Sequence, residues 1–171
     1  MPKEADRLSS FECQMVAFRL LGQWFDHLRE AGVFDNTRIV LVSDHGHYGW
    51  EEPFFVYTTL EGIGGSIDAQ EYNPLLMVKD FESKEFSTDN AFMTNADVPS
   101  LAMTGLVPDP VNPATGNPVN MDPKQGTFLV TTANNFNIGT NNGNTFDTTG
   151  GEWWEFTPGE IYEGANWRKV E

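Results

Sequence analysis

The chain has 171 residues, of which 39% are hydrophobic and 20% charged, and its formal net charge is −15. This composition is typical of a globular domain with a core and excludes an intrinsically disordered chain. A negative charge of this size repels phosphate backbones and anionic lipids, so we expect no nucleic-acid partner and no anionic membrane partner. The single cysteine, Cys13, excludes an internal disulfide and a cysteine-based zinc site.

The first predicted element is a helix over residues 10–31. Ser9 and Glu12 fit the S-x-x-E capping box that begins many helices, and Gly32 suits the left-handed position that ends them. Cys13 lies on the apolar side of this helix, where we expect it to be buried. The apolar face consists of residues spaced three and four apart, namely Phe11, Met15, Phe18, Leu21, Phe25 and Leu28.

A strand is predicted over residues 38–43, because residues 39–42 (Ile-Val-Leu-Val) are continuously apolar. Such a run is typical of an interior strand of an α/β sheet that is covered on both faces. The predicted strand is followed by Asp44, His45, Gly46 and His47. Residues 49–73 are polar and interrupted by glycines, so we expect an irregular stretch there rather than a core element.

Asp44 and His45 are candidate metal ligands. Functional groups of open α/β sheets gather at the carboxyl ends of strands, and a carboxylate beside an imidazole suits Zn²⁺, Mn²⁺ or another divalent ion. Gly46 permits the sharp turn that two adjacent ligands need. His47 is a candidate contact for an anionic substrate. The alternative interpretation is a simple turn with a capping aspartate at position 44.

Further elements follow along the chain. A second buried strand is predicted over residues 74–81 and a third over residues 126–132. Between them, Thr94 and Asp97 open a second helix in the manner of a capping box, which gives Asp97 a structural role. The proline-rich residues 107–126 predict an extended surface loop.

The C-terminal part is rich in Asn, Gly and Thr, and the Asn141-Asn142-Gly143 turn predicts a small antiparallel hairpin unit. We therefore expect two domains, an α/β domain over residues 1–125 and a small β-rich subdomain over residues 126–171. Aromatic side chains in this subdomain either stack sugar rings or cover its small sheet. These side chains are Trp153, Trp154, Tyr162 and Trp167.

Three segments together resemble the C-terminal half of the sulfatase and alkaline-phosphatase superfamily. They read "FDNTRIVLVSDHG", "YNPLLMVKD" and "TNADVPSLAMTGL", and their order and spacing are those of the superfamily. The resemblance covers roughly residues 10–116. The Asp-His pair is more similar to the lipoteichoic-acid-synthase and phosphodiesterase branches than to arylsulfatases.

The resemblance implies a fold and an activity. The fold would be the C-terminal half of a three-layer sheet with flanking helices. The activity would be that of a metal-dependent hydrolase or transferase of sulfuric or phosphoric esters. Asp44 and His45 would then bind a divalent ion (Mn, Mg, Ca or Zn), and His47 would contact the substrate ester.

The chain departs from the superfamily because the nucleophile and the other metal-binding acids belong to the N-terminal half. We therefore expect a C-terminal fragment without catalytic residues, inactive alone and with its metal position unfilled. The parent protein would be exported or anchored with its catalytic domain outside the membrane. Surfaces exposed by truncation favour a homo-oligomer. The alternative function is a non-catalytic glycan-binding or scaffolding domain.

Overall fold

The fold is mixed α/β, with two α-helices and small sheets of two or three strands in the described part of the chain. This confirms the predicted class at that level. The computed structural model describes residues 4–46, 59–112, 116–120, 124–133, 135–140 and 147–170. Two compact units are present, one of Met1–Ile39 with Val78–Ser87 and the other of Val40–Met77 with Thr88–Glu171. We call them unit 1 and unit 2.

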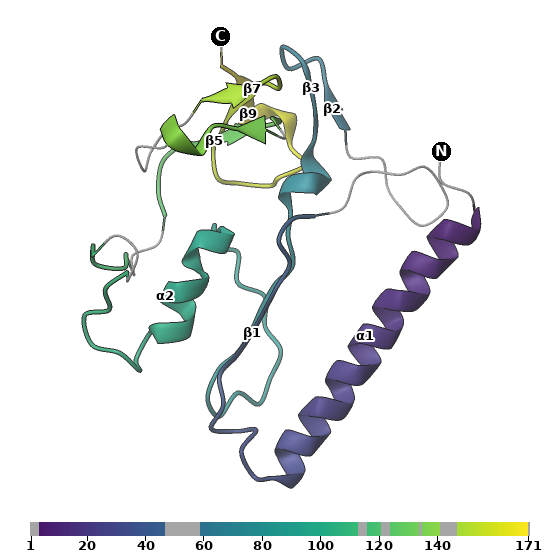
Figure 1. Cartoon of the computed structure of the whole chain (residues 1–171), viewed down its shortest axis with the longest axis vertical. Helices are drawn as coiled ribbons and strands as arrows, with labels where there is room; N and C mark the ends of the chain where they lie inside the picture. The colour runs from purple at the N-terminus through teal and green to yellow at the C-terminus, as the bar shows by residue number, and fades with distance from the viewer. Residues whose placement is uncertain are drawn as a thin grey trace. The chain divides into compact units, whose positions relative to one another are not determined.

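Unit 1 contains α1 (Glu4–Glu30), a single uninterrupted helix (Figure 1). Because α1 begins at Glu4, Ser9 lies inside the helix and the predicted capping box is wrong. The residues before Ser9 include good helix formers such as Glu, Ala, Arg and Leu, so the helix continues through the apparent start signal. Within the described ranges, no helix is both long enough and apolar enough to cross a membrane.

The end of α1 is as predicted. Gly32 has a φ of +70°, the left-handed conformation that glycine adopts without steric cost. The N–H of Gly32 donates to the Arg29 carbonyl and the N–H of Val33 donates to the Leu28 carbonyl, both at 3.0 Å. These two hydrogen bonds form a Schellman motif, which satisfies carbonyls that the helix leaves without a partner.

The apolar face of α1 is only partly covered. Its half-buried members are Leu21, Phe25 and Leu28. The rings of Phe25 and Phe34 lie 5.8 Å apart, so the segment after the helix packs on its last turns. Met15 and Phe18, nearer the start, are more than half exposed. Cys13 is also exposed, and its predicted burial is wrong because it lies beyond the reach of this packing.

Lys79 fastens the loop that follows α1. Its ammonium group donates to the carbonyl oxygens of Phe34, Asp35 and Thr37 and lies 4.5 Å from the centroid of the Phe34 ring. All three donors of the ammonium therefore have backbone acceptors. The loop after the helix is thus held by a lysine more than forty positions away in the sequence.

Arg38 and Asp80 form an ion pair in unit 1. Arg38 Nε donates to Asp80 Oδ1 at 2.9 Å, and the guanidinium lies over the Phe81 ring. This hydrogen bond, with a second one from the Phe81 N–H, holds the pKa of the Asp80 carboxyl below its ordinary value of 3.8. Both interactions favour the ionised carboxylate.

The first two predicted strands are present as β1 (Ile39–Val42) and β4 (Leu76–Lys79), which form a two-stranded sheet. Their expected burial on both faces is wrong. Ile39 is buried, whereas Val42, Met77 and Val78 are exposed. Each of the two strands has one neighbour among the described residues, so apolar side chains remain in contact with solvent.

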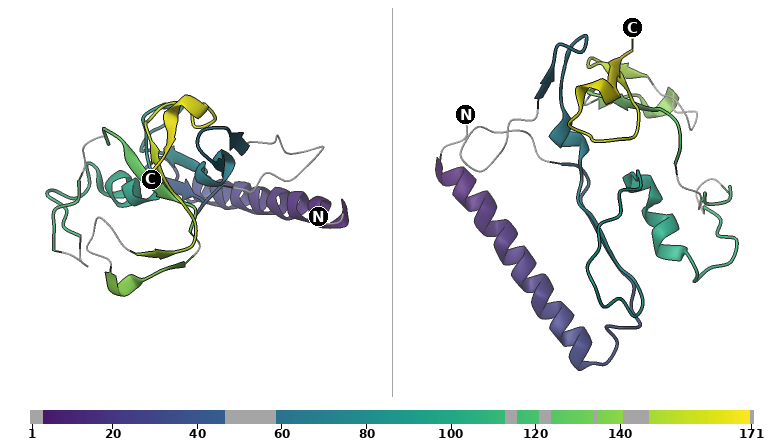
Figure 2. Two further views of the ribbon diagram at one scale, coloured as in Figure 1. Left: turned by 90° about the horizontal axis from the view of Figure 1, so that it is seen from above. Right: turned by 180° about the vertical axis from the view of Figure 1, so that it is seen from behind.

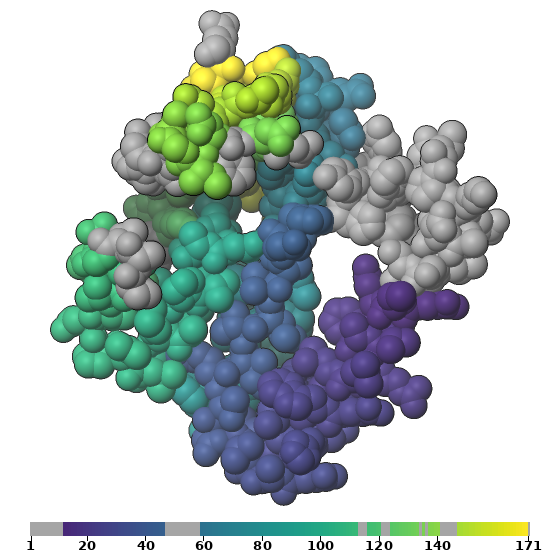
Figure 3. Space-filling view, viewed as in Figure 1, coloured from purple at the N-terminus to yellow at the C-terminus, as the bar shows by residue number. Residues whose placement is uncertain are grey.

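The core of unit 2 lies between a three-stranded antiparallel sheet and a hairpin (Figures 1 and 2). The sheet has the order β5 (Phe128–Thr131), β8 (Trp153–Phe156) and β9 (Trp167–Lys169). The hairpin consists of β2 (Thr59–Glu61) and β3 (Ser66–Asp68), and the short 3₁₀ helix η1 (Ala69–Tyr72) follows it. The space-filling view shows the hairpin lying against the C-terminal strands (Figure 3).

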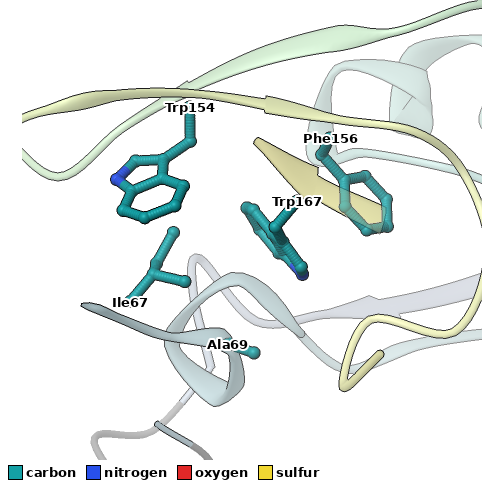
Figure 4. Close-up of a cluster of buried hydrophobic side chains, with 5 residues drawn as sticks. All are labelled: Ile67, Ala69, Trp154, Phe156 and Trp167. Atoms are coloured by element: carbon teal, nitrogen blue, oxygen red, sulfur yellow. The ribbon is translucent and has the colours of Figure 1, made fainter. Parts of the chain in front are cut away.

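Alternation along β8 builds this core. Trp154 and Phe156 point from one face of the strand and meet Trp167 of β9, together with Ile67 and Ala69 (Figure 4). Ile67 and Ala69 belong to the stretch 49–73 that the sequence predicts to lack a core element, so that prediction is wrong. The hairpin contributes Ile67 to the core, with Leu60 and Ile63 packed against it, and its other side chains are polar or glycine. The composition of residues 59–68 therefore gives no indication that the hairpin packs against the core.

The remaining elements are short. They are η2 (Asn95–Asp97), α2 (Val98–Met103), β6 (Asn135–Phe136), η3 (Ile138–Thr140), β7 (Thr148–Thr149) and η4 (Gly164–Asn166). The predicted capping box of Thr94 and Asp97 is confirmed at the start of η2. β6 and β7 pair antiparallel, as the hairpin prediction requires, whereas the predicted turn at residues 141–143 lies outside the described residues.

Candidate functional site

Asp44 and His45 lie together just beyond the end of β1. Asp44 Oδ2 and His45 Nε2 are 3.7 Å apart, and the two side chains are 88% and 60% exposed. Asp44 Oδ1 also accepts a hydrogen bond of 3.0 Å from the His45 N–H. The sequence-predicted ligand pair is therefore assembled at one turn. His47, the candidate substrate contact, lies outside the described residues.

The orientation of the His45 ring decides which nitrogen can bind a cation. Its Nδ1 lies 2.5 Å from the Gly46 carbonyl oxygen. A carbonyl oxygen only accepts hydrogen bonds, so this contact requires the proton on Nδ1. In the neutral ring, Nε2 then carries the lone pair, and Nε2 is the atom near Asp44.

The donor set fits a divalent ion. Ligand atoms at about 2.0–2.2 Å from one ion can be at most about 4.4 Å apart, and the observed separation of Nε2 and Oδ2 is 3.7 Å. A second-sphere carbonyl on Nδ1–H is also the usual arrangement of a ligating histidine. Two ligands do not enclose an ion, and the described residues contain no group of three or more His, Cys, Asp or Glu that could hold one.

Gly46 fixes the turn against η1. Its N–H donates to the Glu71 carbonyl at 2.8 Å. A Cβ atom at position 46 would lie 1.7 Å from the Gln70 carbonyl oxygen. The glycine is therefore required by the close approach of the η1 backbone, since its φ is not in the left-handed region. The predicted reason, freedom to turn sharply, is replaced by this steric one.

Asn95 holds the same turn from the side of η2, and sequence reasoning missed it. Its Nδ2 donates to the Ser43 carbonyl at 3.0 Å and to the Asp44 carbonyl at 2.8 Å. The one signal in the sequence is a polar amide inside "TNAD", where the capping box needs only Thr94 and Asp97. Because asparagine is common at helix starts, that signal has no specificity.

Asp97 has the predicted structural role. Its Oδ2 accepts from the Thr94 N–H at 2.7 Å and from the Lys124 ammonium at 2.7 Å. Lys124 also donates to Thr94 Oγ1. The capping box is therefore tied to the end of the proline-rich segment, and Asp97 is occupied by the helix start rather than available to a metal.

The C-terminal tryptophans have different environments. Trp154 is fully buried and Trp167 is almost so, which makes the sugar-stacking interpretation of these two wrong. Trp153 points to the opposite side of β8 and lines a shallow hollow of about 430 Å³. The other lining residues are Leu129, Gly151, Glu152, Lys169 and Val170. Lys169 also donates to Glu152. This pair lies on the Trp154 side of the sheet, because Lys169 is the cross-strand partner of Trp154.

Two features of unit 2 can thus support chemistry or binding: the Asp44–His45 turn and the hollow beside Trp153. The first offers one carboxylate and one imidazole nitrogen to a cation. The second offers a half-buried tryptophan, Trp153, to a small ligand. Comparison of the chain with protein-family models, curated proteins and solved structures finds no match.

Proposed function

We propose that this chain supplies the Asp44–His45 part of a divalent-metal site in an enzyme that hydrolyses or transfers sulfuric or phosphoric esters. The single observation that carries the proposal is the 3.7 Å approach of His45 Nε2 to Asp44 Oδ2 at the end of β1. Support also comes from the three segments that resemble the sulfatase and alkaline-phosphatase superfamily. In this proposal the chain is the C-terminal part of a longer enzyme.

The exposed sheet fits the same proposal. Val42, Met77 and Val78 are apolar and exposed on β1 and β4. In a three-layer α/β fold, neighbouring strands and flanking helices would cover such residues. The remaining strands, the nucleophile and the further acidic ligands would come from the rest of the parent enzyme.

Each named residue has a defined part in the proposed chemistry. Asp44 and His45 bind the ion, and His47 contacts the charged ester. The ion would polarise an ester oxygen and favour the ionised form of the attacking group. Within this chain, the Gly46 carbonyl keeps the proton of His45 on Nδ1, so that the lone pair of the neutral ring lies on Nε2.

The chain carries its own control for a metal-binding test. A second Asp-His dipeptide, Asp26-His27, lies in α1, where Asp26 is paired with Arg29 at 2.8 Å. Adjacent side chains of a helix diverge, so this dipeptide cannot chelate as a turn can. We expect Mn²⁺ to broaden the NMR resonances of the His45 ring at lower concentration than those of the His27 ring.

The affinity should be weak, in the range of about 0.1–10 mM, because two ligands leave the ion largely hydrated. Asp44→Asn should remove the preference for His45, whereas Asp26→Asn should not change it. Equal broadening of both histidines in the unaltered chain, or a preference that survives Asp44→Asn, would contradict the proposal.

The proposal places the nucleophile outside this chain, which leads to a second expected result. The chain alone should not hydrolyse p-nitrophenyl phosphate or p-nitrophenyl sulfate, with or without Mn²⁺. A measured rate that Asp44→Ala abolishes would show that this chain contains a complete active site. A rate that Asp44→Ala leaves unchanged would indicate a contaminating enzyme.

A second candidate function is glycan binding at the hollow beside Trp153. The supporting observation is the half-buried Trp153 among the residues that line this hollow. The C–H edge of a pyranose ring packs on the negative face of an indole. The net charge of −15 favours a neutral rather than an acidic sugar.

Saccharide titration tests this candidate. Isothermal calorimetry with neutral oligosaccharides, such as cellohexaose and maltohexaose, should give heat that Trp153→Ala abolishes. Trp24→Ala is the matched control, because Trp24 is an exposed tryptophan of α1 in unit 1. Binding that both variants reduce equally would exclude a site at Trp153.

A further inference from the structure

We propose that Asn95 is a positioning residue for the Asp44–His45 pair. The inference rests on the proposed function, since it concerns the geometry of the same ligands. One amide group, Asn95 Nδ2, donates to the carbonyls of Ser43 and Asp44 at 3.0 and 2.8 Å. These are the carbonyls of the two peptide planes that flank the Asp44 Cα.

Fixing both planes fixes Asp44 itself. The orientation of the two planes determines the φ and ψ angles of Asp44, and these set the direction of its Cβ. The second plane also contains the His45 N–H, which donates to Asp44 Oδ1. Asn95 therefore acts on the backbone of both ligands.

The amide of Asn95 has a firm support. It is the first residue of η2, between Thr94 and Asp97 of the capping box. Lys124 binds both of those residues, and the Asp97 and Lys124 side chains are four-fifths and three-quarters buried, respectively. The residues on either side of Asn95 in η2 are thus held by a charge-assisted cluster.

The other side of the turn is held by backbone bonds. The Gly46 N–H donates to Glu71, and the Ser43 N–H donates to Leu75. Ser43 Oγ in turn accepts from the Leu75 N–H at 2.7 Å. Backbone hydrogen bonds therefore hold the residue before the ligand pair and the residue after it. The Asn95 amide adds side-chain hydrogen bonds to the carbonyls of Ser43 and Asp44.

Asparagine has a specific chemistry here. Its amide provides two N–H donors for two carbonyls, whereas an aspartate of the same shape provides none and repels both oxygens. Asn95→Asp should therefore release the turn more completely than Asn95→Ala. Outer-sphere partners of metal ligands typically contribute about 10–100-fold to affinity. For two ligands we expect about a tenfold loss of Mn²⁺ affinity at His45.

The experiment compares three variants of the chain: Asn95→Asp, Asn95→Ala and Asn166→Ala. Asn166 is the matched control, because its Nδ2 also donates to a backbone carbonyl, that of Glu160 at 2.9 Å. Two readouts are needed. The first is Mn²⁺ broadening of the His45 ring, and the second is the ¹⁵N heteronuclear NOE of the His45 amide without metal.

We expect both Asn95 variants to lower the His45 NOE and weaken the Mn²⁺ effect, with an unchanged near-ultraviolet dichroism of the tryptophan core. Asn166→Ala should change neither readout. If His45 shows no Mn²⁺ preference in the unaltered chain but its NOE still falls in the Asn95 variants, the metal proposal fails and the positioning role stands. If the NOE is the same in all variants, the positioning role is wrong.

Discussion

The carbonyl of Gln70 makes glycine necessary at position 46. A side chain there would meet backbone rather than a movable side chain. We expect Gly46→Ala to lower the free energy of unfolding of unit 2 by about 1–3 kcal/mol, because the two segments must separate to admit a methyl group. Urea denaturation followed by tryptophan fluorescence measures this loss.

The control for Gly46→Ala is Gly22→Ala. Gly22 lies within α1, and a Cβ there meets no atom within 4 Å. Alanine is the better helix former, so this substitution should raise stability by up to about 1 kcal/mol. Destabilisation by both substitutions, to the same extent, would argue against the steric role of Gln70.

Asp80 gives unit 1 an acid-sensitive contact. Its hydrogen bond with Arg38 is the main cause that lowers its folded pKa. A carboxyl with a lowered folded pKa contributes stability above its unfolded pKa and loses that contribution as pH falls through the folded value. Unit 1 should therefore lose helix content more steeply below about pH 4 than the Asp80→Asn variant does.

Circular dichroism at 222 nm in a fixed urea concentration, between about pH 2 and pH 6, tests this expectation. The difference should be small, because Asp80 is more than half exposed and water screens the pair. It should shrink further in high salt. Parallel acid transitions in the two proteins would show that the Arg38–Asp80 contact adds no stability.

Among the elements, β8 combines two faces with different tasks. Trp154 and Phe156 enter the core, while Trp153 lines the hollow on the other side. The two buried indoles differ in one respect. Trp167 Nε1 donates to the Ile161 carbonyl at 2.8 Å, whereas Trp154 Nε1 has no acceptor among the described residues.

This difference predicts unequal costs of substitution. Trp167→Phe removes a hydrogen bond and leaves the Ile161 carbonyl without its donor. Trp154→Phe removes a buried N–H that makes no hydrogen bond with the described residues. Both variants lose a similar apolar volume. Trp167→Phe should therefore lower the free energy of unfolding by about 1 kcal/mol more, as measured in urea. Equal losses would indicate that Trp154 Nε1 does have a partner in solution.

Local signals predicted the elements whose causes are local. Gly32 ends α1, Thr94 and Asp97 open η2, and continuous apolar runs mark β1 and β4. Ser9 failed as a start signal because its flanking residues also favour helix. The hairpin of β2 and β3 was missed because its burial depends on Trp154 and Trp167, about ninety residues further along. Pairings of this range leave no trace in a short sequence window.

The candidate site divides in the same way. Asp44 and His45 are adjacent in the chain, so a motif was sufficient to find the pair. Asn95 lies about fifty residues from both and acts on backbone carbonyls. A carbonyl can be bound by any donor, so no residue pattern marks such a contact. The candidate metal ligands could therefore be proposed from the sequence. The hydrogen bonds from Asn95 that hold their backbone could not.

At the scale of the whole molecule, two features have opposite effects on association between chains. Exposed apolar side chains favour it, and the net charge of −15 disfavours it. We propose that the chain self-associates through the first half of α1, where Met15 and Phe18 are more than half exposed. Light scattering should then give a mass that rises with protein concentration. Salt should raise it further, because it screens the repulsion between acidic chains.

A double substitution separates the two contributions to self-association. Met15→Glu with Phe18→Glu should give a monomer at concentrations where the unaltered chain associates. Gln23→Glu, an exposed polar position of the same helix, adds negative charge without removing apolar surface. If Gln23→Glu is as effective as the double substitution, charge alone governs association. A monomer at all concentrations would contradict the proposal.

The order of the two units along the chain has a practical consequence for deletion mapping. The chain changes unit after Ile39, after Met77 and again after Ser87, so neither unit is a continuous stretch. Trimming from the N-terminus through Ile39 would remove the carbonyls that bind the Lys79 ammonium. Residues 78–87 would remain in the shortened product without the rest of unit 1. Trimming as far as Ser87 would remove all of unit 1, but it would also remove residues 40–77, which serve the tryptophan core of unit 2. Shortening the chain from its N-terminus therefore does not separate the two units.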